Sequence, residues 1–154
     1  MNYDDVVTKI NDLGKFGMNF GLERIRKLLD NMGNPQDQLK FIHIVGTNGK
    51  GSVSTMLSNI LTKSGYVTGL FTSPSIISYR ETMQICGKMI NREDLTKCGE
   101  FVLSHWENSY VDGEYPTQFE VTTAIAFEWF KRQNCDYVCL EAGLGGTNDA
   151  TNVI

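Results

Sequence analysis

The sequence predicts an α/β fold of three layers, with a mostly parallel sheet between helices. Short apolar runs that read as buried strands alternate with longer segments in which apolar residues recur at helical spacing. Strands separated by whole helices pair in parallel through right-handed crossovers. The chain has 154 residues, of which 41% are hydrophobic and 21% charged, so it fits a single domain with one core.

Two helices are expected ahead of the first strand. Apolar residues are spaced as on one face of a helix over residues 4–13 and again over residues 21–32. Asn34-Pro35 ends the second helix, because proline disfavours helical geometry in the residue before it. Residues 41–45 then read as a short buried strand.

A glycine-rich turn links this strand to the next helix, with the sequence Gly46-Thr47-Asn48-Gly49-Lys50-Gly51-Ser52. Such a turn aims free backbone N–H groups at one point beside the positive end of the helix dipole, which favours phosphate. Lys50 adds a mobile cation, and the hydroxyl of Ser52 is placed to help hold Mg²⁺. The turn therefore predicts a binding site for a nucleoside triphosphate.

The helix after this turn is expected over residues 50–64, closed by Gly65. Its apolar residues recur at helical spacing and predict one buried face, formed by Val53, Met56, Leu57, Ile60 and Leu61. The alternation then continues to residue 141. The expected elements are a strand over 66–72, a loop over 74–80, a hairpin of 83–85 and 88–90, helices over 92–107 and 119–133, and a strand over 137–141.

The candidate functional groups all follow strands of the predicted sheet. In such sheets ligands collect outside the carboxyl ends of the strands. The glycine-rich turn follows the first strand, Ser73 follows the second and Glu141 ends the third. We expect these regions to converge, with Glu141 as a ligand of Mg²⁺, which prefers hard oxygen ligands. The alternative role for Glu141 is to cap the next turn.

Composition and charge restrict the classes of partner. The net charge of −4 provides no overall basic field for nucleic acid. No apolar run is long enough to cross a bilayer and no leader precedes the first helix, so we expect a cytoplasmic protein. The cysteines lack the paired spacing of zinc or redox motifs, and Cys135 and Cys139 are expected to be buried thiols. His43 and His105 have no arrangement in sequence that suggests catalysis.

The turn departs from the general phosphate-loop pattern. That pattern places Gly six positions before the Lys and Ser or Thr directly after it. Here Ile44 and Gly51 hold those positions, so an ordinary glycine turn leading into a helix is the alternative.

Residues 43–52, HIVGTNGKGS, resemble the folylpolyglutamate synthase and dihydrofolate synthase family, ATP-dependent amide-forming ligases related to the Mur ligases. The resemblance begins earlier, at residues 21–25, and continues in the family's order at residues 71–74, 81, 119–123, 141–146 and 149–152. The resemblance implies a phosphate-loop type of domain. It also implies ATP and Mg²⁺ as cofactors, and folate and L-glutamate as substrates joined through an acyl phosphate. Whether dihydrofolate synthase activity is also present is left open.

The resemblance also implies residue roles. Lys50 and Glu141 are expected to be catalytic, and Ser52, Ser73 and Glu141 to hold Mg²⁺. The expected nucleotide contacts are Thr47, Asn48, Gly49, Lys50, Gly51 and Ser52, and the expected substrate-loop residues are Pro74, Ser75, Glu81 and Glu120. Glu120 also lies near a predicted helix start, where a carboxylate complements the helix dipole, so a capping role is the alternative.

Three further residues follow from the same comparison. Arg80 is expected to be solvated, with contact to an anionic substrate as the alternative. Asp149 and Asn152 are expected to hold the closing loop together. Ser75, Thr82 and Thr147 depart from residues common in the family, which leaves substrate preference open.

Family members continue well beyond the position matched by Ile154. The sequence is therefore expected to be a fragment, incomplete on the C-terminal side of the fold and without full activity. An unpaired sheet edge and apolar surface would favour self-association. The parent protein is expected to be a monomer that acts on small molecules, without nucleic acid or membrane partners. A non-catalytic nucleotide-binding fragment and a phosphotransferase with a phosphate loop remain the alternatives.

Overall fold

The computed structural model describes residues 1–16, 21–73, 78–143 and 149–154. Each expected helix and strand is present, and its ends lie within two residues of the expected ones. The helices are α1 (Tyr3–Leu13), α2 (Glu23–Asn31), α3 (Lys50–Lys63), α4 (Arg92–Trp106) and α5 (Gln118–Arg132). The strands are β1 (Phe41–Ile44), β2 (Thr68–Phe71), β3 (Met83–Ile85), β4 (Lys88–Met89) and β5 (Tyr137–Glu141).

The five strands form one sheet in the order β1-β5-β2-β3-β4. β5 pairs in parallel with both β1 and β2, so the last strand in sequence lies between the first two. The predicted hairpin, β3 and β4, extends the sheet by antiparallel pairing of β3 with β2. The carboxyl ends of the three parallel strands therefore meet at one rim.

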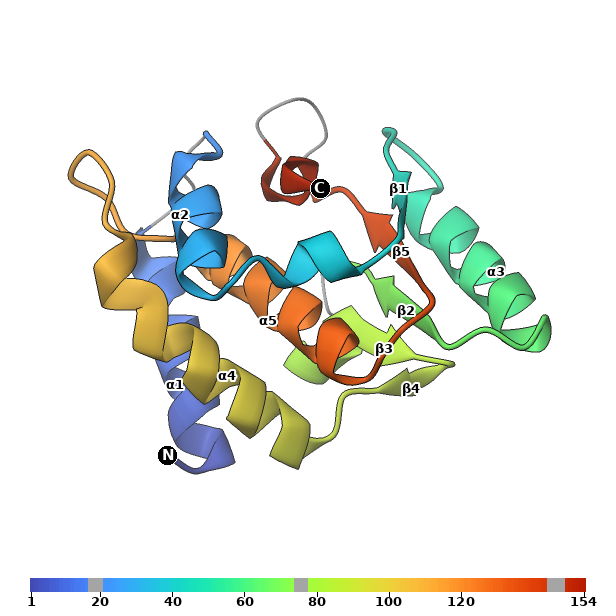
Figure 1. Cartoon of the computed structure of the whole chain (residues 1–154), viewed down its shortest axis with the longest axis horizontal. Coiled ribbons are helices and arrows are strands. Elements are labelled where there is room, and N and C mark those ends of the chain that lie inside the picture. Colours follow the sequence, from blue (N-terminus) through green and yellow to red (C-terminus); the bar gives the residue numbers. More distant parts are fainter. Residues whose placement is uncertain (17–20, 74–77, 144–148) are drawn as a thin grey trace.

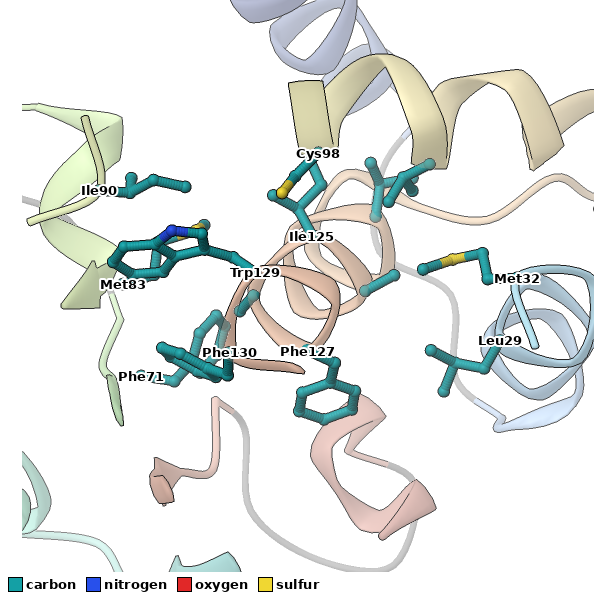
Figure 2. Close-up of a cluster of buried hydrophobic side chains, with 14 of the residues drawn as sticks. Leu29, Met32, Phe71, Met83, Ile90, Cys98, Ile125, Phe127, Trp129 and Phe130 are labelled. Atoms are coloured by element: carbon teal, nitrogen blue, oxygen red, sulfur yellow. The ribbon is translucent and has the colours of Figure 1, made fainter. Parts of the chain in front are cut away.

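Helices cover the two faces of the sheet unequally. Figure 1 shows α3 on one side of the sheet and α1, α2, α4 and α5 on the other. α5 lies at the centre of the thicker layer, where all residues from Glu120 to Phe130 are buried. Its side chains point in several directions, toward α2, α4 and the sheet (Figure 2). The ring of Phe127 meets that of Phe41 in β1 edge to face, with centroids 5.1 Å apart.

The expected buried face of α3 is wrong, although the helix itself is confirmed. Val53, Met56 and Ile60 are 47%, 57% and 61% exposed, whereas Ser54 and Ser58 are buried. α3 packs mainly over β5 and β2. The small side chains of Ser54 and Ser58 lie between the helix and the sheet, so Val53, Met56 and Ile60 point away from the sheet.

Other expectations concern smaller features. Cys135 and Cys139 are buried as expected, and burial raises the pKa of these thiols to about 12 and about 11, which favours the protonated thiol at neutral pH. Arg80 is not simply solvated, because its Nη1 donates a hydrogen bond to the carbonyl of Ile90 at 3.2 Å. Within the described residues, none of the helices combines the length and the apolar character that crossing a bilayer requires.

Candidate functional site at the rim of the parallel strands

The glycine-rich turn connects the end of β1 to the start of α3. Gly49 has φ +75° at the N-cap of α3, a left-handed conformation that glycine adopts without cost. No side chain caps this end of the helix, so its first N–H groups have no side-chain acceptor and can meet an anion. Thr47, Asn48 and Ser52 are exposed around this helix end.

Lys50 links the turn to the neighbouring strand. Its ammonium donates a hydrogen bond to the carbonyl oxygen of Ala142 at 2.9 Å, immediately after β5. This contact crosses from the β1–α3 connection to the carboxyl end of β5. The lysine is thus held at the rim, at the mouth of the turn.

Glu141 ends β5 beside this lysine. It is only 6% exposed, and burial raises its pKa above the ordinary value, opposed by a hydrogen bond from the backbone N–H of Ser73 and by the charge of Lys50. A Cβ on Gly51 would lie 3.9 Å from Glu141 Oε2, which places the carboxylate next to the first turn of α3. The structure therefore brings together the three strand ends that the sequence predicted would converge.

The rim carries hard oxygen groups, which are the type of ligand that Mg²⁺ prefers. Among the described residues, no group of three or more His, Cys, Asp or Glu side chains could hold a metal by itself. Mg²⁺ does not need such a cage, because it keeps several waters and takes one or two protein oxygens together with phosphate. Glu141 supplies a buried carboxylate, and Ser52 and Ser73 supply hydroxyls from two other segments of the rim.

A cavity of about 210 Å³ opens beside Ser73. It lies between the end of β2, the 3₁₀ turn Tyr79–Thr82 and the start of α5, and it is lined by Phe71, Ser73, Tyr79, Thr82, Gln118, Phe119 and Thr122. Most of the lining surface is apolar, although five of the seven lining residues carry a hydroxyl or an amide. The Tyr79 hydroxyl donates to Thr122 Oγ1 at 2.7 Å, and burial raises the pKa of Tyr79, so this phenol stays neutral.

The expected substrate-loop residues lie in different surroundings. Glu120 is 3% exposed; it completes the capping box of α5 with Thr117 and accepts a hydrogen bond from Arg24 Nε at 3.0 Å. These contacts give it the capping role. Its second oxygen, Oε2, is buried without a hydrogen-bond partner. Glu81 is half-buried in the 3₁₀ turn, while Pro74 and Ser75, like Thr147, lie outside the described residues.

One chain of polar contacts was not predicted from the sequence. His43 Nε2 lies 2.8 Å from Thr151 Oγ1, and the Thr151 hydroxyl and backbone N–H both donate to Asp149 Oδ1. Because the hydroxyl proton goes to Asp149, His43 must supply the proton of its own contact, from Nε2. Asp149 thus holds the closing turn as expected. The contact with β1 joins residues 108 positions apart and has no local signal in the sequence.

The chain is similar to curated and solved folylpolyglutamate synthases. No protein-family model matches it. It is 38% identical to the dihydrofolate synthase/folylpolyglutamate synthase of Bacillus subtilis, over 99% of this chain and 36% of that protein. The folylpolyglutamate synthase of Thermotoga maritima superposes with a TM-score of 0.89 at 41% identity, over 99% of this chain and 35% of that one.

A complex of a folylpolyglutamate synthase with AMPPCP and folate is also similar. It is 35% identical, with a TM-score of 0.87, and the match covers all of this chain and 38% of that one. The chain therefore spans about a third of the length of these relatives.

Proposed function

Because this chain belongs to the folylpolyglutamate synthase and dihydrofolate synthase family, we propose that it forms the nucleotide-binding part of a ligase that joins L-glutamate to folate at the expense of ATP. Forming an amide from a carboxylate and an amine requires activation of the carboxylate. ATP does this by transferring its γ-phosphoryl group, and the amine then attacks the acyl phosphate. Catalysis of the first step rests on positioning and on neutralising charge around the phosphoryl group.

The proposal rests on one observation, the meeting of Lys50, Ser73 and Glu141 at the rim. Lys50 reaches the carbonyl of Ala142, and the Ser73 N–H reaches Glu141, so three separate connections share one small site. The uncapped start of α3 adds N–H donors for phosphate. Moving Lys50 Nζ from the Ala142 carbonyl to a phosphate exchanges a neutral acceptor for a charged one, which strengthens the hydrogen bond.

We propose residue roles that this geometry supports. We assign the phosphates to residues 47–52, and Mg²⁺ to Ser52, Ser73 and Glu141. When bound, the ion would neutralise phosphate charge. The turn would hold the phosphate, and Glu141, which lies beside the first turn of α3, would hold the ion. We likewise propose that Mg²⁺ is the bound ion, that Ser52 and Ser73 are its hydroxyl ligands, and that Lys50 and Glu141 are catalytic.

The folate is assigned to the side of the rim that holds the cavity. Half-buried Phe119 offers aromatic surface there, with its ring centroid 6.1 Å from that of the fully buried Phe71, and Gln118 offers an amide for hydrogen bonding. The cavity adjoins Ser73, so a carboxylate beyond the aromatic part of the substrate would lie near the phosphate site. A cytoplasmic, monomeric parent protein without nucleic acid or membrane partners also stays a prediction.

Nucleotide titration by calorimetry, in the presence of magnesium, tests the proposed site. Lys50→Ala should weaken ATP binding by about 10- to 100-fold, the worth of a hydrogen bond to a charged group. Lys63→Ala is the matched control, because it removes a lysine from the exposed far end of the same helix. Equal affinity for the wild type and Lys50→Ala, with native circular dichroism, would show that the turn is structural.

Phosphate release separates the alternatives once binding is established. Release that depends on both folate and glutamate, in a version of the protein extended to the length of its relatives, supports the ligase. Release or transfer without glutamate favours a phosphotransferase. Binding without turnover in that longer version favours a non-catalytic nucleotide-binding protein.

A further inference from the structure

Three hydroxyls that line the cavity beside Ser73 give their protons to the protein itself. Thr122 Oγ1 lies 2.8 Å from the carbonyl oxygen of Gln118, which can only accept, so the Thr122 proton goes to that carbonyl. Tyr79 Oη lies 2.7 Å from Thr122 Oγ1 and must therefore supply the proton of that contact. Thr82 Oγ1 donates to the carbonyl of Tyr79 at 2.8 Å. Toward a ligand in the cavity these three side-chain oxygens can only accept.

The direction of α5 places part of this lining away from the rim. A Cβ on Gly143, just after β5, would lie 2.6 Å from the ring of Phe119, which belongs to the first turn of α5. A Cβ on Gly69 in β2 would lie 2.8 Å from the ring of Phe130, near the other end of α5. α5 therefore starts at the rim and runs away from it, so Thr122 lies about one helical turn deeper than the first residue of the helix.

The two ends of the cavity thus differ in hydrogen-bonding character. The Gln118 amide and the Ser73 hydroxyl, which can donate as well as accept, lie at the rim end. Tyr79 and Thr122 meet at the inner end, where their hydroxyl oxygens only accept. A ligand that fills the cavity therefore meets acceptors with its inner edge.

The cavity does not suit a carboxylate. None of its described lining residues carries a charge, and burial raises the pKa of Tyr79, so its phenol adds none. An ion enclosed here would lose hydration without gaining a partner. The volume of about 210 Å³ is also below the range of about 300–1,000 Å³ for sites that enclose a drug-sized ligand. The cavity therefore takes one uncharged ring system, and an acidic tail would leave it on the Ser73 side.

We propose that Tyr79 is a specificity-determining residue, whose phenol oxygen accepts a hydrogen bond from an amino group at the inner edge of a heteroaromatic ring. This inference rests on the assignment of folate to this cavity in the proposed function. The 2-amino group of the folate pteridine lies at the edge furthest from the glutamate tail, so it reaches the inner end when the tail leaves toward the rim. A ring without a donor at that edge leaves the Tyr79 oxygen buried and unpaired, which is how a polar site rejects an analogue.

Calorimetric titration with a matched pair of ligands tests this role. The pair is folate and an analogue in which a methyl group replaces the 2-amino group. The wild type should bind folate about 10-fold more tightly, the worth of one buried hydrogen bond. Tyr79→Phe should lose most of this preference, because the acceptor is gone. Tyr66→Phe is the matched control, since Tyr66 is 43% exposed and precedes β2 at the end of the sheet opposite the rim, and it should keep the preference.

Thr122→Val tests the direction of the hydrogen bonds. It leaves Tyr79 in place but removes the acceptor of its proton, so the phenol O–H becomes free to donate to a ligand. A third ligand, with a carbonyl oxygen in place of the 2-amino group, should bind poorly to the wild type because two acceptors meet. Relative to folate, it should gain affinity in Thr122→Val. A contact that is only structural would weaken all three ligands alike and leave their ratios unchanged.

The possible failures can be told apart. Folate binding with the same preference in the wild type and in Tyr79→Phe overturns this inference and leaves the folate assignment intact. Equal ligand ratios in the wild type and in Thr122→Val overturn the hydrogen-bond directions on which the inference depends. A chain that binds ATP but not folate overturns the assignment of folate to the cavity, and this inference with it.

Discussion

Glu141 is a residue whose charge costs stability, because its carboxylate is buried. Burial raises its pKa above the ordinary 4.5, so the folded state favours the protonated form more than the unfolded state does. Stability therefore falls as the pH rises from 4.5 through the raised pKa, and stays lower above it. Binding of phosphate through a metal ion would instead need the ionised carboxylate of Glu141.

Glu141→Gln should accordingly have two effects of opposite sign. Without nucleotide at pH 8 it should stabilise the fold by up to about 1 kcal/mol, because it removes the buried charge. With magnesium and ATP it should gain less stability than the wild type, and its nucleotide affinity should depend less on magnesium. Urea denaturation with and without the ligands measures both, with Glu107→Gln as an exposed control. A wild-type response to magnesium would show that Glu141 is not a ligand.

His43 gives the fold a second dependence on pH, with the opposite slope. Burial lowers its pKa below 6.5, although the charge of Asp149 opposes this, so protonation favours the unfolded state. Its contribution to stability is complete above pH 6.5 and is lost as the pH falls through the lowered pKa. His43→Gln keeps a donor for Thr151 without titrating.

The stability of His43→Gln should thus fall less steeply than that of the wild type below pH 6.5. At pH 8 the two should agree within about 1 kcal/mol, the worth of one hydrogen bond. Urea denaturation from pH 5 upward, with His105→Gln in α4 as the second-histidine control, checks this. Parallel pH curves for the wild type and His43→Gln would contradict it.

Among the elements, the approach of α1 to α4 depends on a glycine. A Cβ on Gly99 of α4 would lie 2.5 Å from Val6 Cγ1 of α1, closer than carbon atoms can approach. Val6 is fully buried, so it cannot move aside into solvent.

Gly99→Ala should destabilise the protein by about 1–3 kcal/mol, the usual cost of overpacking, despite the better helix propensity of alanine. Combining it with Val6→Ala should recover part of the loss, because the clash then disappears. Lys97→Ala, an exposed change two residues earlier, should cost less than about 0.5 kcal/mol. Thermal unfolding followed by circular dichroism measures all three. A neutral Gly99→Ala would show that the helices shift freely.

Local patterns predict these elements better than they predict their surroundings. Helical spacing of Val53, Met56 and Ile60 correctly indicates that they share a face. It does not say what lies opposite that face, and the sheet meets Ser54 and Ser58 instead. The hairpin could be predicted because its turn is local. The pairing of β3 with β2 could not, because it joins segments that are far apart in the sequence.

Convergence of the site could be predicted because topology alone produces it. Parallel strands place their carboxyl ends at one rim, so Ser73 and Glu141 had to lie near the glycine-rich turn once the pairing was right. The link from His43 to Thr151 depends on side-chain packing across 108 residues. Nothing in the pattern of either segment reports that contact.

At the scale of the whole molecule, the reaction needs two sites, one for ATP and one for the incoming amine, and the residues assigned to phosphate belong to the first. Lys50, Ser73 and Glu141 would hold ATP and the activated carboxylate. Amide formation also needs the incoming amine within about 3–3.5 Å of the acyl phosphate, in a site that excludes water. The chain spans about a third of the relatives' length, and the rim around Thr47, Asn48 and Ser52 is exposed.

We therefore predict that these 154 residues bind ATP but do not extend folate with glutamate. ATP binding should survive because the turn and the start of α3 are local features that do not need the part of the active site that holds the amine. Catalysis should not, because an acyl phosphate open to water is hydrolysed before an unheld amine can attack. Mass spectrometry of the products, after incubation with tetrahydrofolate, glutamate, magnesium and ATP, measures this directly. Glutamate addition above the level of a Lys50→Ala control would contradict the prediction and place a complete active site within this chain.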